Sequence, residues 1–593
     1  MEFSRQHSKQ NGSVDINPAS RNLSILLIWR LTIYRQTCLY IEKNMMTNID
    51  PVHDYAKAYE SYDLQVAKQT FAGNLDTGVN ACIECCDRYA IGHAKALDWI
   101  STRCERKNFT FAELKLRSAK VANFLVSQGI KPGDVVSGLL PRTPELVALI
   151  LGTLRTGAVY QPLFTAFGSK AIEHRIMLCE SKMIVTDGEN HSKLNTIKNC
   201  PAIAVISTTE DPSKESHIDY LSSVEKQTTE FEPVMRNGED LMLMMSTSGT
   251  TGPAKGVPVP LRALLSFRTY MVDAIDLRPE DAYWNIADPG WAYGLYYAVL
   301  GPLLLGHCTT LFEGSFTVDG TYDILKRLEI TNLAGSPTAY RVMIAAGPEA
   351  AKRMKGKLRV VSSAGEPLNP EVIRWFREYL DAPIFDHYGQ TETGMIVNNH
   401  HALSHPVRDG SAGYAMPGFS VAVLTEDDRI APVNEQGLLV VDIAKSPAFW
   451  FTGYLNMETK AITGGYYRTG DMVEQDENGC VTFVGRSDDV ITSSGYRIGP
   501  FDVESALLEH PAVVETAVVG VPDPKRTELV KAVVVLNQEV IASEELKEEL
   551  RLFVRNRLSS HSYPRIIEFI NALPKTPSGK VQRFLLRKQK IDN

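Results

Sequence analysis

The spacing of apolar and polar positions predicts alternating helices and strands from residue 108 onward. Thr110 and Glu113 have the spacing of a capping box, apolar residues follow at helical intervals, and Gly129 marks the end of that helix. The apolar run 135–140 predicts a strand, and Thr143 with Pro144 opens the next helix. Repeated units of this kind predict an α/β fold, in which helices cover both faces of parallel-rich sheets.

The pattern changes near Gly485. Residues 481–484 predict a strand and 485–489 a polar turn, and then the β-branched runs 513–519 and 530–536 precede a helix over 544–558. This order predicts a small mobile α+β domain at the C-terminus, joined to a large N-terminal α/β domain. We expect an extension over 1–45, the large domain over 46–486, a hinge over 487–490 and the small domain over 491–593.

The first 45 residues differ from the rest of the chain. Residues 1–22 are polar and lack periodicity, and the apolar stretch 23–40 is interrupted by Arg30 and Arg35. These charges argue against a stable membrane span, which needs about 20 clean apolar residues. We interpret the segment as a disordered or spurious extension, with Met45 or Met46 as the true start.

Composition excludes several classes of protein. The net charge of −8 over 593 residues, without a basic stripe or a repeat, argues against nucleic-acid binding and against a structural role. Nine cysteines without framework spacing indicate a reducing, cytoplasmic compartment. Cys82, Cys85 and Cys86 cluster without a second ligand pair, so buried helix-face thiols are favoured over a zinc site.

A loop rich in glycine and hydroxyl side chains follows the apolar run 241–245. Its glycines permit close backbone approach, its serines and threonines add donors, and Lys255 adds a positive charge. Such a loop is suited to wrap phosphates. It is not a Walker A loop, because Ala254 and Gly256 flank the lysine where that pattern needs Gly and Ser or Thr.

Other motifs also carry side chains that are suited to ligand binding or catalysis. The segment 386–394 presents Tyr388 as a flat face for a purine, and oxygens of Thr391 and Glu392 that suit Mg²⁺. Taken alone, its Thr-Glu-Thr-Gly portion is more often a helix start. Asp471, in a tight turn, is suited to accept hydrogen bonds from two ribose hydroxyls. Near the chain end, Lys580 follows a loop braced by proline and glycine.

Together with 485–489 and 493–499, these segments resemble, in this order, the adenylate-forming superfamily of acyl-CoA synthetases, luciferases and peptide-synthetase adenylation domains. The similarity runs from about residue 63 to 589 and is greatest to acetyl-CoA and medium-chain acyl-CoA synthetases. It implies an enzyme that activates a small carboxylic acid with ATP and Mg²⁺ through an acyl-adenylate, and then transfers the acyl group to coenzyme A. A monomer or small homo-oligomer is expected.

The resemblance implies a role for each motif. The residues implied to hold the ATP phosphates are Thr247, Ser248, Gly249, Thr250, Thr251, Gly252 and Lys255. Those implied to surround the adenine are Gly365, Glu366, Pro367, Asp386, His387 and Tyr388, and the ATP site also takes in Gly389 and Gln390. Those implied to line the coenzyme A tunnel are Ser494, Gly495, Tyr496, Arg497 and Arg526.

The resemblance also implies the catalytic groups. Thr391 would contact the α-phosphate, Glu392 would hold Mg²⁺, and Lys580 would bridge the acid and the α-phosphate. Asp471 and Arg486 are implied to bind ribose, and Asp488 to be the hinge. The acid is already an anion at neutral pH, so adenylation needs alignment and charge neutralisation rather than a general base.

The sequence departs from the family at two places. The proline of the phosphate loop stands one residue early, and Ser562 replaces a lysine that contacts coenzyme A in medium-chain enzymes. Acetate-specific relatives carry Trp where Gly389 stands, so Gly389 predicts an acid larger than acetate, with Trp291 as another wall of the acyl pocket.

Two other activities remain open: an acetyl-CoA synthetase, and a stand-alone adenylation enzyme that loads a carrier protein. The second usually has an aspartate near Trp291 for an amine, and the spacing of Asp288 does not match well. A catalytically dead nucleotide-binding protein is a further alternative. Against it stands the joint presence of Lys255, Glu392, Asp471, Arg486 and Lys580.

Overall fold

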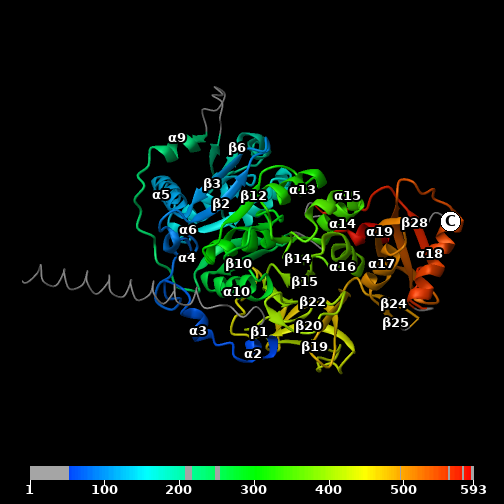
Figure 1. The fold of residues 1–593 in the computed structure, drawn as a ribbon. Helices are drawn as coiled ribbons and strands as arrows, with labels where there is room; N and C mark the ends of the chain where they lie inside the picture. The colour runs from blue at the N-terminus through cyan, green and yellow to red at the C-terminus, as the bar shows by residue number, and fades with distance from the viewer. Residues whose placement is uncertain are drawn as a thin grey trace, which may run out of the picture. The chain divides into compact units, whose positions relative to one another are not determined.

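A computed structural model describes residues 53–206, 217–247, 254–494, 496–558, 561–576 and 580–588. The described residues from Asp54 onward form one compact unit (Figure 1). The predicted extension over 1–45 lies outside the described residues. Among the helices in the described ranges, none is both long and apolar enough to cross a membrane.

Two large sheets form the predicted parallel-rich core. The first has seven strands in the order β10 (Gly256–Pro260), β9 (Leu241–Ser246), β5 (Val159–Pro162), β4 (Val135–Leu139), β6 (Met183–Asp187), β7 (Ala202–Ile206) and β8 (Ile218–Asp219). The second has nine, in the order β18 (Tyr414–Ala415), β16 (Gly394–Asn398), β15 (Ile384–Gln390), β14 (Val360–Ala364), β13 (Asn332–Gly335), β11 (Tyr283–Asn285), β12 (Thr309–Phe312), β2 (Lys95–Ile100) and β3 (Arg106–Thr110). Antiparallel pairs occur only toward the sheet ends, at β9–β10, β2–β3, β15–β16 and β16–β18.

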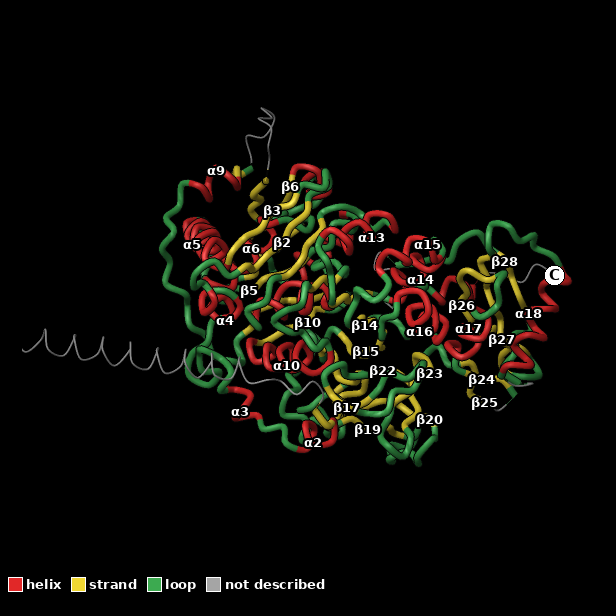
Figure 2. Tube along the Cα trace, viewed as in Figure 1, coloured by secondary structure: helices red, strands yellow, loops and turns green. Residues whose placement is uncertain are grey.

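Helices lie between and around these sheets (Figure 2). They include α2 (Tyr55–Glu60), α3 (Leu64–Lys68), α4 (Ala81–Cys85), α5 (Phe111–Ser127), α6 (Pro144–Arg155), α7 (Ser169–Leu178), α8 (Gly188–His191), α9 (Tyr220–Glu225), α10 (Leu264–Thr269), α11 (Ala292–Gly294), α12 (Gly301–Leu304), α13 (Val318–Arg327), α14 (Pro337–Ala345), α15 (Pro348–Ala351) and α16 (Pro370–Trp375). The predicted capping box of α5 is confirmed, because Thr110 and Glu113 bond each other's backbone. Helix α6 begins at Pro144 with Thr143 as its cap, also as predicted.

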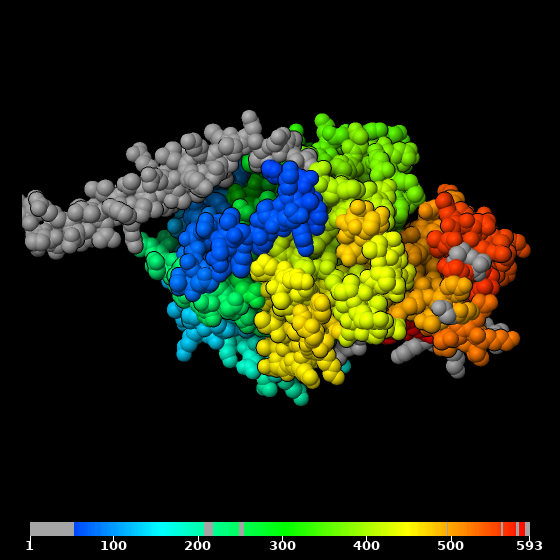
Figure 3. Space-filling view, turned by 90° about the horizontal axis from the view of Figure 1, so that it is seen from below, coloured from blue at the N-terminus to red at the C-terminus, as the bar shows by residue number. Residues whose placement is uncertain are grey.

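A third, antiparallel sheet closes the large domain, and the sequence patterns did not predict it. It joins β19 (Val421–Leu424), β20 (Gln436–Asp442), β22 (Tyr466–Gln475), β21 (Ile462–Thr463) and β23 (Val481–Arg486). The residues around it, coloured yellow, form a continuous surface in Figure 3. Its register makes Asp471 and Arg486 direct cross-strand partners, although 14 residues separate them in the chain.

The C-terminal region is the predicted α+β unit. Its sheet joins β25 (Tyr496–Ile498), β24 (Ile491–Ser493), β27 (Thr527–Leu536), β26 (Val513–Asp523) and β28 (Ile566–Phe569). Its helices are α17 (Pro500–Leu508), α18 (Glu544–Arg557) and α19 (Arg583–Lys588). Strand β26 is four residues longer than its predicted run, and α18 ends one residue earlier than predicted.

The three clustered cysteines are buried in the core, as predicted. Cys82 and Cys85 lie on α4 and Cys86 caps it, and all three are fully shielded from solvent. Within the described ranges, no group of three or more His, Cys, Asp or Glu residues is arranged to hold a metal ion.

His401 is a half-buried histidine that contacts residues of β14 and β15. The ring of His401 stacks on Phe385 with centroids 4.3 Å apart, and its Nε2 lies 3.0 Å from the carbonyl oxygen of Val361. Burial lowers the pKa of His401 to about 3. The folded protein therefore keeps this ring neutral at acidities at which the unfolded chain takes up a proton.

We expect His401→Gln to make stability less sensitive to acid. Between pH 7.5 and 5.5 the unfolded chain gains a proton at His401 and the folded chain does not. The free energy of unfolding should therefore fall by about 1.4 kcal/mol more in the wild type than in the variant. Urea unfolding at both pH values measures the difference, and other buried groups contribute equally to both proteins. Replacement of the exposed His93 is the control, and parallel profiles for wild type and His401→Gln would contradict the expectation.

Candidate active site

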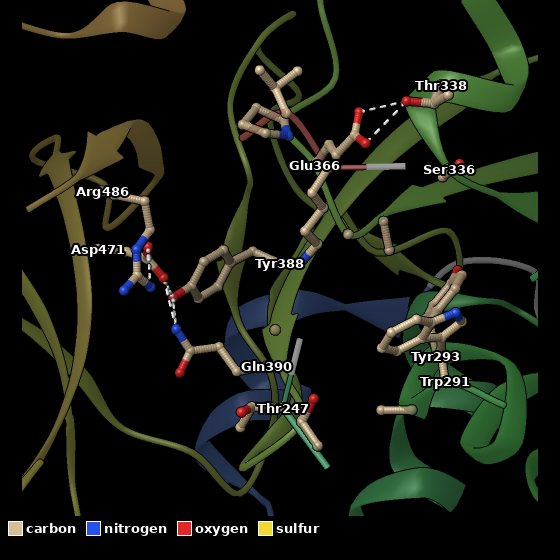
Figure 4. A pocket seen from close by; sticks show the side chains of 18 of the residues that line it. Thr247, Trp291, Tyr293, Ser336, Thr338, Glu366, Tyr388, Gln390, Asp471 and Arg486 are labelled. Carbon is tan, nitrogen blue, oxygen red and sulfur yellow. Dashed lines mark hydrogen bonds and ion pairs between the residues drawn. The ribbon is translucent and has the colours of Figure 1, made fainter. Parts of the chain in front are cut away.

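A large cavity lies at the carboxyl ends of β13, β14 and β15. Its lining includes residues just beyond these strands, side chains from β22 and β23, and the segment that carries Lys580. Crevices outside the carboxyl ends of parallel strands are the usual ligand sites of α/β sheets. Figure 4 shows Trp291 and Tyr293 on one side of the cavity and Tyr388, Asp471 and Arg486 on the other.

Asp471 is the centre of a hydrogen-bonded cluster on one wall. The Tyr388 hydroxyl donates to its Oδ2 at 2.5 Å, Gln390 Nε2 donates to the same oxygen at 2.7 Å, and Arg486 lies 3.2 Å from its Oδ1 (Figure 4). Burial raises the pKa of Asp471, and the charge of Arg486 counteracts that rise. Tyr467, which the sequence patterns did not single out, fixes Gln390 by donating to its Oε1 at 2.6 Å.

Asp386 lines the same cavity, and one of its carboxylate oxygens is buried without a partner among the described residues. Its Oδ2 accepts from the backbone N–H of Leu368 at 3.1 Å, whereas its buried Oδ1 has no hydrogen-bond partner among the described residues. The residue is only 6% exposed, and burial raises its pKa well above the ordinary value. A buried acceptor without a partner is costly, so a ligand that offers an N–H group here would be stabilised.

Glu366 is held rigidly beside this acceptor. Both of its carboxylate oxygens lie 2.9 Å from the Thr338 hydroxyl, and Arg341 donates to Oε2 at 2.8 Å. The preceding Gly365 has φ +95°, a left-handed conformation that glycine adopts without strain. This turn brings its backbone to the cavity edge next to Asp386. The sequence patterns did not predict Thr338 or Arg341, which no motif marks.

Glu392 is a buried carboxylate surrounded by cationic groups. The Tyr454 hydroxyl donates to its Oε1 at 2.8 Å, and the Lys255 ammonium lies 4.6 Å from the centre of the Tyr454 ring. Burial raises the pKa of Glu392, while Tyr454 and the charges of Lys255 and Lys580 act in the opposite direction. Two lysines far apart in the sequence are thus close enough to influence the same carboxylate.

The base of the predicted phosphate loop is closed by hydrogen bonds. Thr247 N–H donates to the Lys255 carbonyl, and Lys255 N–H donates to the Thr247 hydroxyl, both at 3.0 Å. The antiparallel strands β9 and β10 hold these two ends together. The expected phosphate ligands Ser248, Gly249, Thr250, Thr251 and Gly252 lie outside the described residues.

The segment that carries Lys580 is anchored inside the C-terminal region. Thr576 N–H donates to the Lys580 carbonyl at 2.8 Å, and Lys580 N–H donates to the Thr576 hydroxyl at 3.1 Å. Beyond the lysine, Arg583 donates to Glu504 of α17 at 2.7 Å, and Arg587 pairs with Asp489 beside the expected hinge residue Asp488. Lys580 lines the cavity in this arrangement.

The residues expected to contact coenzyme A do not line this cavity. Tyr496 is 51% exposed and stacks on His561 with ring centroids 4.0 Å apart. Arg526 donates to the Ser494 hydroxyl at 3.1 Å, and Arg497 pairs with Glu426. Gly495 lies outside the described residues. The sequence patterns did not single out His561, which precedes the substituted Ser562.

The motif around Thr391 is a β-hairpin, and this corrects the interpretation of its Thr-Glu-Thr-Gly portion as a helix start. Strand β15 continues through Gln390, residues 391–393 make the turn, and β16 returns from Gly394. The register shifts between Tyr388 and Gly389. The hairpin brings Glu392 to the cavity while Tyr388 stays hydrogen-bonded to Asp471.

The structure also corrects the interpretation of Gly389 as a missing wall of the acyl pocket. Gly389 borders the cavity, but a Cβ at this position would lie 2.1 Å from the Gly394 carbonyl oxygen and 2.6 Å from Met395 Cα. A side chain would therefore collide with the returning strand instead of filling the cavity. In this structure, a side chain at position 389 would need the returning strand to shift.

We expect Gly389→Ala to destabilise the fold by about 3 kcal/mol, because the added methyl group must displace backbone. Urea unfolding measures the loss. Gly188→Ala is the matched control, since a Cβ there meets no atom within 4 Å, and its change should stay within about 0.5 kcal/mol. Equal stabilities of the two variants would show that the hairpin adapts.

Trp291 lines the other side of the cavity with an apolar ring. Its ring lies 5.5 Å from that of Phe164 and 5.2 Å from that of Phe167. Asp288 stands nearby but is already engaged: its Oδ1 accepts from Gly290 N–H at 2.8 Å, and its Oδ2 lies 3.4 Å from Arg142. It is therefore poorly placed to hold the amine of an amino acid.

Comparisons with known proteins agree with this arrangement. The family described as AMP-binding enzyme matches residues 90–455, and the AMP-binding enzyme C-terminal domain matches residues 502–580. Acetyl-coenzyme A synthetase of Bacillus subtilis is 35% identical over 545 residues, which cover 90% of this chain and 94% of the relative. 4-Hydroxybutyrate–CoA ligase 1 of Metallosphaera sedula is 36% identical over 513 residues, 84% of this chain and 88% of the relative.

Solved structures show the same likeness. An acyl-CoA synthetase of Brucella canis has a TM-score of 0.76 and 61% identity, and the match covers 91% of this chain and 99% of the other. The anthranilate CoA ligase AuaEII, solved in complex with anthranoyl-AMP, has a TM-score of 0.79 and 25% identity, with 86% and 97% covered.

The fold and the cavity are thus those of an AMP-binding enzyme with its C-terminal domain. More narrowly, the chain belongs to the AMP-forming acyl-CoA synthetases, a family of acid–thiol ligases. ATP and coenzyme A are the co-substrates that fit this family.

Proposed function

We propose that the enzyme converts a short- to medium-chain carboxylic acid larger than acetate, with ATP and coenzyme A, into an acyl-CoA, AMP and diphosphate. The acid would be activated as an acyl-adenylate in the described cavity. The observation that carries this proposal is the convergence of the Asp471–Arg486 pair, Glu392, Lys255 and Lys580 on one cavity, although they come from four separate parts of the chain.

The nucleotide would lie between the two walls. Asp386 Oδ1 offers an unused acceptor for an N–H donor, which the adenine amino group supplies, and Tyr388 offers its ring face. Asp471 would accept from the ribose hydroxyls, with Arg486 keeping it ionised. The phosphates would face Thr247, Lys255 and the loop between them, where backbone N–H groups and a cation favour anions.

Glu392 would hold Mg²⁺, since a buried carboxylate among phosphate-binding groups is the oxygen ligand that this ion prefers. Bound there, the ion would neutralise charge on the phosphates. Lys580 would hold the acid carboxylate and the α-phosphate together, and Thr391 would contact the α-phosphate. The chain's contribution is alignment and charge neutralisation, because the attacking carboxylate needs no base.

The preference for an acid larger than acetate rests on the far wall of the cavity. Trp291 and Phe164 make it apolar, and Ala287, Ala292 and Ala364 leave room beside them. Each methylene buried there stabilises binding by about 0.8 kcal/mol. The relatives named for 4-hydroxybutyrate and anthranilate act on acids larger than acetate, whereas the Bacillus relative is named for the acetyl group.

The thioester half-reaction would follow a turn of the small domain about Asp488. Ser494, Tyr496, Arg497 and Arg526 lie outside the cavity that holds Lys580, so a rotation is needed to bring their surface to the adenylate. Loading of a carrier protein is the second candidate, and Asp288, engaged by Arg142, does not favour an amino acid substrate.

ATP–pyrophosphate exchange across linear acids from acetate to octanoate, with small aromatic acids included, tests the proposal. Exchange should depend on the acid and on Mg²⁺, and kcat/KM should be higher for butyrate than for acetate. Thioester should form with free coenzyme A. Acetate as the best acid would refute the proposed chain length, and absence of exchange with every acid would refute the activity itself.

A further inference from the structure

A chain of two buried side chains and one half-buried side chain leads from the core to the cavity wall. Tyr293 lines the cavity and its hydroxyl oxygen lies 3.2 Å from that of Tyr270. The Tyr270 oxygen lies 2.7 Å from His387 Nδ1, and His387 Nε2 lies 3.0 Å from the carbonyl oxygen of Asn399. Tyr270 is fully buried and His387 is 2% exposed.

The hydrogens of this chain can be assigned from its inner end. A carbonyl oxygen only accepts, so His387 Nε2 carries the hydrogen that points to Asn399. Burial lowers the pKa of His387 well below its usual value, so the ring is neutral and Nδ1 is an acceptor. Tyr270 therefore donates its single hydrogen to His387, and Tyr293 must donate its own to Tyr270.

This assignment fixes the chemical character of Tyr293 toward the cavity. Its only hydrogen is committed to Tyr270, and its oxygen keeps lone-pair capacity. Any ligand group that meets this oxygen must therefore be a donor. The oxygen is a neutral phenol, so a hydroxyl group is a better partner than a charged ammonium group, which would favour a carboxylate.

We infer that Tyr293 selects acids that carry a hydroxyl group on the acyl chain, so that the substrates of the proposed acyl-CoA synthetase activity are short hydroxy acids. The inference rests on the proposed function, because it needs the acyl chain to lie along the wall of Trp291 and Tyr293. Trp291 and the neighbouring alanines would enclose the rest of the chain, and Tyr293 supplies a neutral polar group on the same side of the cavity.

Matched pairs of acids test the inference, since a hydroxyl and a methyl group have similar size. The pairs are 2-hydroxybutyrate with 2-methylbutyrate, 3-hydroxybutyrate with 3-methylbutyrate, and 4-hydroxybutyrate with pentanoate. In ATP–pyrophosphate exchange, at least one hydroxy acid should exceed its methyl partner in kcat/KM by about tenfold. In Tyr293→Phe that ratio should fall to about one or below, because the acceptor is gone.

Two further variants distinguish selection of the hydroxyl group by Tyr293 from a general effect of losing a tyrosine hydrogen bond. Tyr270→Phe removes the partner that fixes the Tyr293 hydrogen and should reduce the ratio less than Tyr293→Phe does. Tyr89→Phe also removes a tyrosine hydrogen bond, from its hydroxyl to the Leu304 carbonyl, but Tyr89 does not line the cavity. It should leave the ratio unchanged.

Three outcomes would overturn the inference while leaving the proposed function intact. One is exchange with the methyl acids that equals or exceeds exchange with every hydroxy partner in the wild type. Another is an unchanged ratio in Tyr293→Phe. The third is a rise in the KM for ATP in Tyr293→Phe that is the same for all acids, which would show that Tyr293 contacts the nucleotide. Absence of exchange with all acids, by contrast, would refute the proposed function.

Discussion

Lys580→Ala is expected to lower acid-dependent ATP–pyrophosphate exchange by about 10³-fold, the loss typical of removing one charge-stabilising group from an active site. The reason lies in its placement: Lys580 lines the cavity and its charge reaches both Glu392 and Asp471. Formation of thioester from supplied acyl-AMP and coenzyme A should survive within about threefold, because the proposed turn of the small domain takes Lys580 away from the adenylate before the thiol attacks.

The control for this variant is Lys547→Ala, which removes the same charge from α18, where the half-buried Lys547 pairs with Glu544 and does not line the cavity. It should leave both half-reactions unchanged. Stopped-flow measurement of thioester formation and isotope exchange of pyrophosphate give the two rates separately. Equal damage to both steps in Lys580→Ala would show that the lysine supports the fold or the whole cycle rather than adenylation alone.

Asp471→Asn is expected to reduce kcat/KM for ATP by about 10²-fold, mainly through a higher KM. The asparagine keeps the shape but loses the charge that accepts from Tyr388, Gln390 and Arg486. Hydrogen bonds to a charged group contribute about 1.5–3 kcal/mol each, so weakening one or two to the ribose accounts for the expected change. Initial rates at varied ATP concentration measure it.

Asp476→Asn is the matched control, because Asp476 belongs to a turn beyond β22 and accepts from the backbone of Asn478 and Cys480. It is absent from the cavity lining. If Asp471→Asn binds ATP as tightly as the control does, Asp471 supports the sheet and does not contact the nucleotide.

The sequence predicted an element correctly where residues close together in the chain determine it. The Thr110 capping box, the Thr143 cap and the β-branched strands of the small domain depend on residues close in the chain. The antiparallel sheet that pairs Asp471 with Arg486 was not predicted, because its register depends on contacts between strands. The same reason hid Tyr454, Tyr467 and Arg341, whose partners are distant in the sequence.

Gly389 shows a different limit of sequence reasoning. A glycine in a motif is compatible both with space for a ligand and with close approach of backbone, and only the position of the Gly394 carbonyl distinguishes them. The Thr391 turn is similar, since its residue types suit a helix start as well as a hairpin. The order of the motifs along the chain identified the family, whereas the geometry of each motif could be seen only in the folded structure.

The anchoring of Lys580 has a consequence for the timing of the reaction. Arg583 and Arg587 pair with Glu504 and Asp489, so a turn of the C-terminal region, as proposed above, would carry Lys580 with it. One orientation of the C-terminal region cannot both hold the lysine over the adenylate and open the path of the thiol. Diphosphate should therefore leave before coenzyme A enters, and steady-state kinetics should show a ping-pong pattern between these two molecules.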